Sequence, residues 1–150
     1  MAAAESTYIE PSALARLFLN QHGSRELSLW CARTHTPIDV TLHGKAEIVN
    51  AICRSCFTKE IDDGEMEEAL ADLEQDFITG RFKLADVLWR SALHRSAELS
   101  KEFTPLLGVR SLDVLHVACA LELGKHHFLT FDVKQQALAT KAGLKIVRIL

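Results

Sequence analysis

The sequence predicts an α/β protein with three layers, α/β/α, around a mainly parallel central sheet. Two observations lead to this class: short β-type runs recur along the chain, and amphipathic segments with helical periodicity separate them. Alternation of this kind favours parallel strands joined by helices. The third observation is length, because 150 residues without repeats, low-complexity tracts or linkers indicate a single domain over residues 1–150.

Five short runs rich in β-branched, aromatic or alternating apolar residues are predicted strands. The first stops at Glu10 and Pro11, and the last follows Gly143, which suits the left-handed position after a helix. The predicted strands cover residues 7–9, 38–42, 82–85, 128–131 and 145–149.

Seven segments beside these strands are predicted helices. Pro11 suits the first turn of a helix, where its missing N–H is tolerated. We expect the fifth helix to stop before Thr104 and Pro105, and the sixth to end at Gly124. The predicted helices cover residues 11–19, 23–30, 45–57, 65–78, 87–103, 111–123 and 134–142, with a turn at residues 62–64.

The composition is that of an ordinary globular protein, with 48% hydrophobic and 25% charged residues. Residues 1–6 lack the basic and apolar regions of a signal peptide, and no run approaches the roughly 20 apolar residues of a membrane span. We therefore expect a cytoplasmic protein. Its formal net charge of −3 argues against gripping nucleic acid through overall positive charge.

The four cysteines are interpreted as free structural thiols. Cys53 and Cys56 have the C-x-x-C spacing of redox or zinc sites, but they fall within a predicted helix and have no second pair. Thiolates are stabilised at helix starts, not within helices. The structural interpretation is therefore preferred.

Four acidic residues occupy positions that solvation alone does not explain. Glu10 and Asp132 directly follow predicted strands, where ligand crevices form in parallel sheets. Glu47 lies in the first turns of the helix after the second strand. Asp113 opens a helix that is apolar on nearly every face, so burial of its carboxylate requires a cation, a metal or a raised pKa.

Each acid also has a simpler explanation, since a carboxylate at a helix start caps the backbone or stabilises the helix dipole by about 0.3–1 kcal/mol. All four nevertheless lie at strand-to-helix switches, which a parallel sheet gathers at one edge. Carboxylates gathered in this way repel one another unless divalent cations neutralise them, and ligation by oxygen alone suits Mg²⁺ or Mn²⁺. Such ions support hydrolysis of phosphodiesters.

Four motifs resemble those of PIN domains. Any one of them is weak, but together they keep the family's order and rough spacing from residue 8 to residue 132. The matching segments are residues 8–14 (YIEPSAL) with Y-x-D-x-S-A-L, 47–52 (EIVNAI) with E-x-x-N-A-L, 110–118 (RSLDVLHVA) with R-x-x-D-x-x-H-x-A, and 129–132 (LTFD) with L-T-x-D.

The chain's length resembles that of VapC-type toxins within this family. The resemblance implies a PIN-like fold and an Mg²⁺- or Mn²⁺-dependent endoribonuclease that cuts tRNA or rRNA. It also implies a homodimer and an antitoxin protein as partner. Trp89 is interpreted as a packing residue or as a residue of the dimer face. The implied metal ligands are Glu10, Glu47, Asp113 and Asp132, with Ser12 and Thr130 at supporting positions. Asn50, one turn after Glu47, could orient a carboxylate or reach a phosphate.

The sequence departs from the family at Glu10, where the family usually has aspartate. The extra methylene shifts the carboxylate outward, and Mg²⁺ tolerates little distortion of its octahedron. A PIN-like module that has lost catalysis and binds protein or RNA therefore remains an alternative, as does a DNA-directed nuclease of related fold. Arg110 could pair with a substrate phosphate or with the acids. His116 is interpreted as a hydrogen-bonded structural histidine rather than a proton shuttle.

Overall fold

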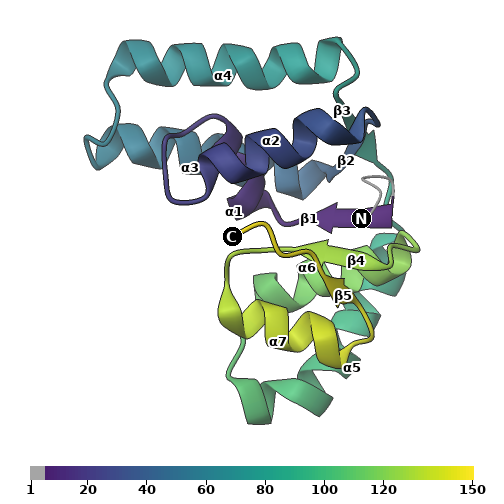
Figure 1. Cartoon of the computed structure of the whole chain (residues 1–150). Helices are drawn as coiled ribbons and strands as arrows, with labels where there is room; N and C mark the ends of the chain where they lie inside the picture. Colours follow the sequence, from purple (N-terminus) through teal and green to yellow (C-terminus); the bar gives the residue numbers. More distant parts are fainter. Residues whose placement is uncertain (1–5) are drawn as a thin grey trace. The chain divides into compact units, whose positions relative to one another are not determined.

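The computed structural model describes residues 6–150, in which short strands alternate with helices (Figure 1). Every strand pairing found among these residues is parallel. The predicted α/β/α class with parallel strands is therefore confirmed. The expectation about a signal peptide refers to residues 1–6, and residues 1–5 lie outside the described residues. Within the described part of the chain, no helix is both long and apolar enough to cross a membrane.

The chain divides into two compact units, and the sheets follow this division. Unit 1 contains residues 6–10 and Asp86–Arg148, and unit 2 contains Pro11–Ala85 with the last two residues. Each unit has its own parallel sheet, with three strands in unit 1 and two in unit 2. The expectation of a single domain over residues 1–150 stays a prediction.

Unit 1 is built on the strand order β1-β4-β5, which places the N-terminal strand against a strand near the other end of the sequence. The register pairs Ile9 with Leu129 and Phe128 with Ile146. The strands are β1 (Thr7–Ile9), β4 (His127–Leu129) and β5 (Lys145–Ile146), and the helices are α5 (Trp89–Leu107), α6 (Ser111–Glu122) and α7 (Val133–Lys141).

The core of unit 1 centres on α6, which is buried on most faces as its apolar sequence predicts. Tyr8 of β1 stacks on Phe128 of β4 with 5.5 Å between ring centroids, which adds an aromatic contact to the strand pairing. Both rings belong to the same buried cluster as the apolar residues of α6, so this core holds β1 and β4 against the helix.

Unit 2 pairs β2 (Ile38–Thr41) with β3 (Phe82–Ala85), and Ile38 lies opposite Phe82. The chain between these parallel strands forms two long helices, α3 (Leu42–Phe57) and α4 (Asp63–Ile78). Before them come α1 (Pro11–Leu14), the 3-10 turn η2 (Ala15–Leu17) and α2 (Ser24–Thr34). Phe82 is 1% exposed and makes edge contacts with the rings of Phe18 and Phe77.

Thr41 and Gly44 determine how α3 begins. The Thr41 hydroxyl accepts a hydrogen bond from the Gly44 backbone N–H at 3.0 Å and so caps the helix. A Cβ at position 44 would lie 2.8 Å from Thr41 Oγ1 and 3.1 Å from Pro11 Cγ. Gly44 is therefore required for close packing at the start of the helix, not for an unusual backbone angle.

Two predicted helix boundaries were wrong because local bonds outweigh residue preference. The fifth helix does not stop before Pro105 but continues to Leu107, and Gly108 then closes it with φ 63° and an N–H bond to Thr104 O. Pro105 lies in the last turn, so it removes only one late helical bond, while the helix packs extensively on α6. The predicted turn at residues 62–64 is instead a capping box, in which Asp62 and Glu65 exchange side-chain and backbone bonds and α4 begins at Asp63.

Smaller corrections concern the ends of other elements. The predicted helix over residues 11–19 is divided into α1 and the 3-10 turn η2, because it tightens after Leu14. The last two strands are shorter than predicted, and α2 is longer. Helix α3 is also longer, because Thr41 caps it earlier than its apolar pattern indicates. These differences leave the order of elements unchanged.

We expect Gly44→Ala to lower the thermal midpoint by a few degrees. The added Cβ would displace either the capping hydroxyl of Thr41 or the ring of Pro11. Loss of a cap costs about 0.5–2 kcal/mol, and together with the clash this outweighs the gain of about 1 kcal/mol from replacing glycine with alanine in a helix.

Gly64→Ala is the matched control, because a Cβ there meets only Asp62 Oδ1 at 3.4 Å, an ordinary contact. Its midpoint should stay unchanged or rise. Thermal unfolding followed by circular dichroism measures both variants, and an equal fall in the two would contradict the role given to Gly44.

Candidate functional site

Three of the four predicted metal ligands, Glu10, Asp113 and Asp132, belong to unit 1, and the fourth, Glu47, belongs to unit 2. In unit 1 the three acids follow β1, open α6 and follow β4 respectively, as the sequence predicts.

Glu10 directly follows β1, and its residue is only 4% exposed. Its backbone N–H donates to Leu129 O at 3.0 Å, which continues the parallel pairing of β1 with β4 by one residue. Because Leu129 is the last residue of β4, Glu10 lies beside the point where that strand ends. The side chain is thus a buried acid at the carboxyl edge of the sheet, where ligand sites of parallel sheets form.

Asp132 caps α7. Its Oδ1 accepts hydrogen bonds from the backbone N–H groups of Lys134 at 2.8 Å and Gln135 at 3.2 Å. The capping interpretation of this acid is therefore correct. It does not compete with metal binding, because both bonds fall on Oδ1 and a carboxylate has two oxygens with about four acceptor positions.

Asp113 lies in the first turn of α6, and its pKa is raised above the ordinary value. Desolvation by burial is the largest cause, and the negative charge of Asp132 is the second. The charges of His116 and Arg110, and a backbone hydrogen bond from Arg110, oppose these effects without cancelling them. Asp132 is thus close enough to Asp113 for its negative charge to disfavour ionisation of the Asp113 carboxyl.

Thr130, which matches a supporting position in the PIN resemblance, bonds to the backbone of Asp132. It is 3% exposed, and its hydroxyl accepts a hydrogen bond from the Asp132 backbone N–H at 3.1 Å. The same hydroxyl donates to Gln135 Oε1 at 2.7 Å. Thr130 therefore connects the end of β4 to the start of α7 through side-chain bonds.

Gln135 is the residue of this region that sequence reasoning missed. It is 1% exposed, and its Nε2 donates to the backbone carbonyl of Asp113 at 3.2 Å. A signal was present, because Gln135 shares the buried face of α7 with Leu138 and Ala139, where a polar residue is unusual. A buried amide on an apolar face needs partners, and here they belong to the acidic region.

Arg110 and His116 lie on either side of Asp113 in the sequence, and the charge of each lowers the pKa of Asp113. Arg110 is exposed, and whether it pairs with the acids or with a substrate phosphate stays a prediction. His116 is 1% exposed and its Nδ1 bonds with the Tyr8 hydroxyl at 2.7 Å. This bond agrees with the interpretation of His116 as a structural histidine.

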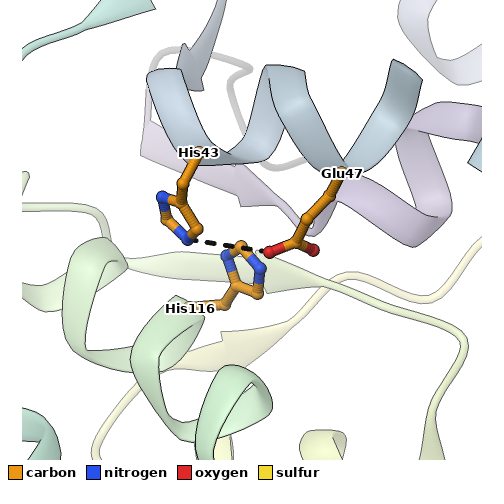
Figure 2. A group of neighbouring side chains, drawn as sticks. All are labelled: His43, Glu47 and His116. Atoms are coloured by element: carbon orange, nitrogen blue, oxygen red, sulfur yellow. Dashed lines mark ion pairs between the residues drawn. The ribbon is translucent and has the colours of Figure 1, made fainter. Parts of the chain in front are cut away.

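Glu47 lies on α3 in unit 2 and is partly exposed. Figure 2 shows it one helical turn after His43, with 3.9 Å between His43 Nε2 and Glu47 Oε1. Asn50 follows on the same helix and is exposed, and Ser12 is exposed on α1. The supporting roles of Asn50 and Ser12, like that of Glu47 as a ligand, stay predictions.

All four cysteines are free thiols. The Cys56 thiol donates to Asp63 Oδ1 at 3.2 Å, and this bond is the main cause that raises its pKa. Burial raises the pKa of Cys31 to about 11. Raised pKa values favour the thiol over the thiolate that redox chemistry and metal binding require, which supports the structural interpretation of both.

The donor set of unit 1 fits a hard divalent cation. Glu10, Asp113 and Asp132 offer only carboxylate oxygens, which Mg²⁺ and Mn²⁺ prefer. Burial of Asp113 and its repulsion by Asp132 are both relieved by a nearby positive charge. Comparison with protein-family models and with curated proteins finds no match for the chain.

We expect Asp113→Asn to raise the thermal midpoint of the metal-free protein at pH 7. Because the folded state raises this pKa, it holds the proton more tightly than the unfolded chain does, and ionisation of Asp113 destabilises the fold. The penalty is absent below the ordinary pKa of 3.8, grows as the pH rises toward the folded value, and is complete above it. Asparagine never ionises, so it avoids the penalty.

Thermal unfolding in EDTA across this pH range measures the effect. The gap between variant and wild type should close as the pH falls toward 3.8. Glu102→Gln, at an exposed position on α5, is the control and should show no such gap. A less stable Asp113→Asn protein at pH 7 would mean that Asp113 is stabilising in its ionised form.

Proposed function

We propose that this protein is a PIN-like, Mg²⁺- or Mn²⁺-dependent endoribonuclease whose metal centre is built on Glu10, Asp113 and Asp132. One observation carries the proposal: Asp132 helps to raise the pKa of Asp113, so two carboxylates lie close together at the end of β4. Glu10, buried beside that strand end, adds the third. Such an arrangement of like charges is unfavourable without a cation.

The chemistry follows from the oxygen donors. Divalent cations held by carboxylates lower the pKa of a bound water and neutralise charge on a phosphodiester. The protein's own residues hold the acids in place: Thr130 supports Asp132, and the Arg110 charge acts beside Asp113. Hydrolysis in this form needs no covalent enzyme intermediate. The motif resemblance adds Glu47 as a fourth ligand, and mutation of Glu47 tests that addition.

The resemblance to VapC-type toxins extends the proposal to a cytoplasmic toxin that cuts tRNA or rRNA and is held inactive by an antitoxin protein. A homodimer is part of the same proposal. It is supported by the exposed apolar side chains Leu88, Trp89 and Leu93 at the start of α5, since exposed apolar clusters are a common feature of subunit contacts. Growth arrest on expression, relieved by a small neighbouring gene and absent for Asp113→Ala, tests the toxin assignment.

Purified protein should cleave total RNA in the presence of Mg²⁺ or Mn²⁺ and should lose this activity in EDTA. Asp113→Ala should reduce the cleavage rate at least about 100-fold. Loss of a residue that only supports a metal ligand costs up to about 100-fold, and loss of a ligand itself should cost at least as much. Glu47→Ala should show a comparable loss if Glu47 is a ligand. The rates are measured on labelled RNA with gel separation.

Two outcomes would count against the nuclease. Cleavage that survives EDTA or Asp113→Ala would show that these acids do not carry it. Absence of cleavage on every RNA, with Mn²⁺ still bound, would favour the alternative, a PIN-like module that binds protein or RNA without cutting. Glu10 is the feature that favours this alternative.

Glu10→Asp should shift the metal preference from Mn²⁺ toward Mg²⁺ by several-fold. Aspartate restores the shorter side chain found at this position in PIN domains, and Mg²⁺ is the more demanding ion in geometry. Cleavage rates and metal affinities in each ion measure the shift, with Glu10→Gln as the control that should lose both. If Glu10→Asp changes neither property, the longer side chain has no catalytic consequence.

A further inference from the structure

The buried amide of Gln135 links the two acids that begin α6 and precede α7. Its Oε1 accepts from Thr130 Oγ1 at 2.7 Å, and its Nε2 donates to Asp113 O at 3.2 Å. Thr130 Oγ1 in turn accepts from the Asp132 backbone N–H at 3.1 Å. An unbroken chain of hydrogen bonds therefore runs from the backbone of Asp132 to the backbone of Asp113.

Only one orientation of the Gln135 amide satisfies this chain. The Asp113 carbonyl can only accept, so the NH₂ group must face it and Oε1 must face Thr130. The Thr130 hydroxyl accepts from Asp132 and so has its proton available for Oε1. The direction of every bond is thus fixed by the backbone groups at the two ends.

We propose that Gln135 is a positioning residue that fixes the backbones of Asp113 and Asp132 at the separation at which one divalent cation binds both carboxylates. This inference rests on the proposed metal centre and adds a residue to it. The two acids repel each other, so some neutral connection must hold their backbones together when no cation does so. A buried amide supplies that connection without adding charge.

Packing alone does not explain a glutamine here. The neighbours of Gln135 on the buried face of α7 are Leu138 and Ala139, and an apolar side chain of similar length would pack equally well with them. It would, however, leave the Thr130 hydroxyl and the Asp113 carbonyl without their Gln135 bonds. Glutamate would bring a further carboxylate and could not donate to Asp113 O.

The experiment compares Mn²⁺ affinity of the full chain for wild type, Gln135→Met and Gln136→Met, by titration calorimetry and electron paramagnetic resonance. Gln135→Met should weaken binding about 10- to 100-fold, the usual effect of removing a residue that orients metal ligands. Gln136 is the matched control, because its Nε2 donates to Thr130 O at 2.8 Å but does not belong to the chain between the acids. Its variant should bind Mn²⁺ within about twofold of wild type, about 0.4 kcal/mol.

Thr130→Val interrupts the same series of hydrogen bonds at its other side chain, because valine has no hydroxyl to bond with Gln135 or with the Asp132 N–H. If these hydrogen bonds act together, either single substitution already removes their effect. The double variant Thr130→Val/Gln135→Met should then bind Mn²⁺ no more weakly than whichever single variant has the lower affinity. Thermal midpoints of the metal-free variants are measured alongside, because a purely structural role for Gln135 would lower the midpoint and leave Mn²⁺ affinity unchanged.

Wild-type affinity in Gln135→Met, or equal weakening in Gln136→Met, would overturn the positioning role and leave the proposed metal centre intact. If folded wild type binds no Mn²⁺, the metal centre itself fails, and the role of Gln135 fails with it. The two failures are therefore distinguished by the wild-type titration alone.

Discussion

Parallel pairing of β1 with β4 is the interaction on which the candidate site depends. It brings together segments from near the two ends of the chain, and the bond from Glu10 N–H to Leu129 O carries the pairing past the last strand residue. Since parallel strands end at the same edge, the residues that follow them meet there. This register places Glu10 beside Leu129, three residues before Asp132 in the sequence.

This arrangement is electrostatically unfavourable because it buries Asp113 beside the charge of Asp132, and other residues offset part of that effect without a cation. Asp132 uses one oxygen to cap α7, Arg110 lowers the pKa of Asp113, and Gln135 contributes a neutral connection. Even with these contacts, burial and the charge of Asp132 keep the pKa of Asp113 above its ordinary value. The region is therefore held together by hydrogen bonds that involve the side chains of Thr130, Asp132 and Gln135, while the Asp132 charge disfavours ionisation of Asp113, and a cation would relieve that repulsion.

The sequence predicts those parts of the fold and site that depend on local pattern. The order of elements, the burial of α6 and the position of each acid after a strand or at a helix start all follow from periodicity and turn residues. Features set by distant contacts were not predicted. Helix α5 continues through Pro105 because it packs on α6, and the Gln135 amide bonds to Asp113, 22 residues before it in the sequence. The resemblance to PIN domains identified Thr130 but gave no sign of Gln135.

Asp132 serves helix α7 and the proposed metal centre with the same carboxylate, and this sharing restricts how the position can change. Replacement by alanine would remove a helix cap together with a ligand, so loss of activity in that variant would not distinguish chemistry from folding. Asparagine keeps the cap and gives up the charge. In evolution, a lineage that abandons catalysis is therefore expected to retain a capping side chain at this position long after the other acids have drifted.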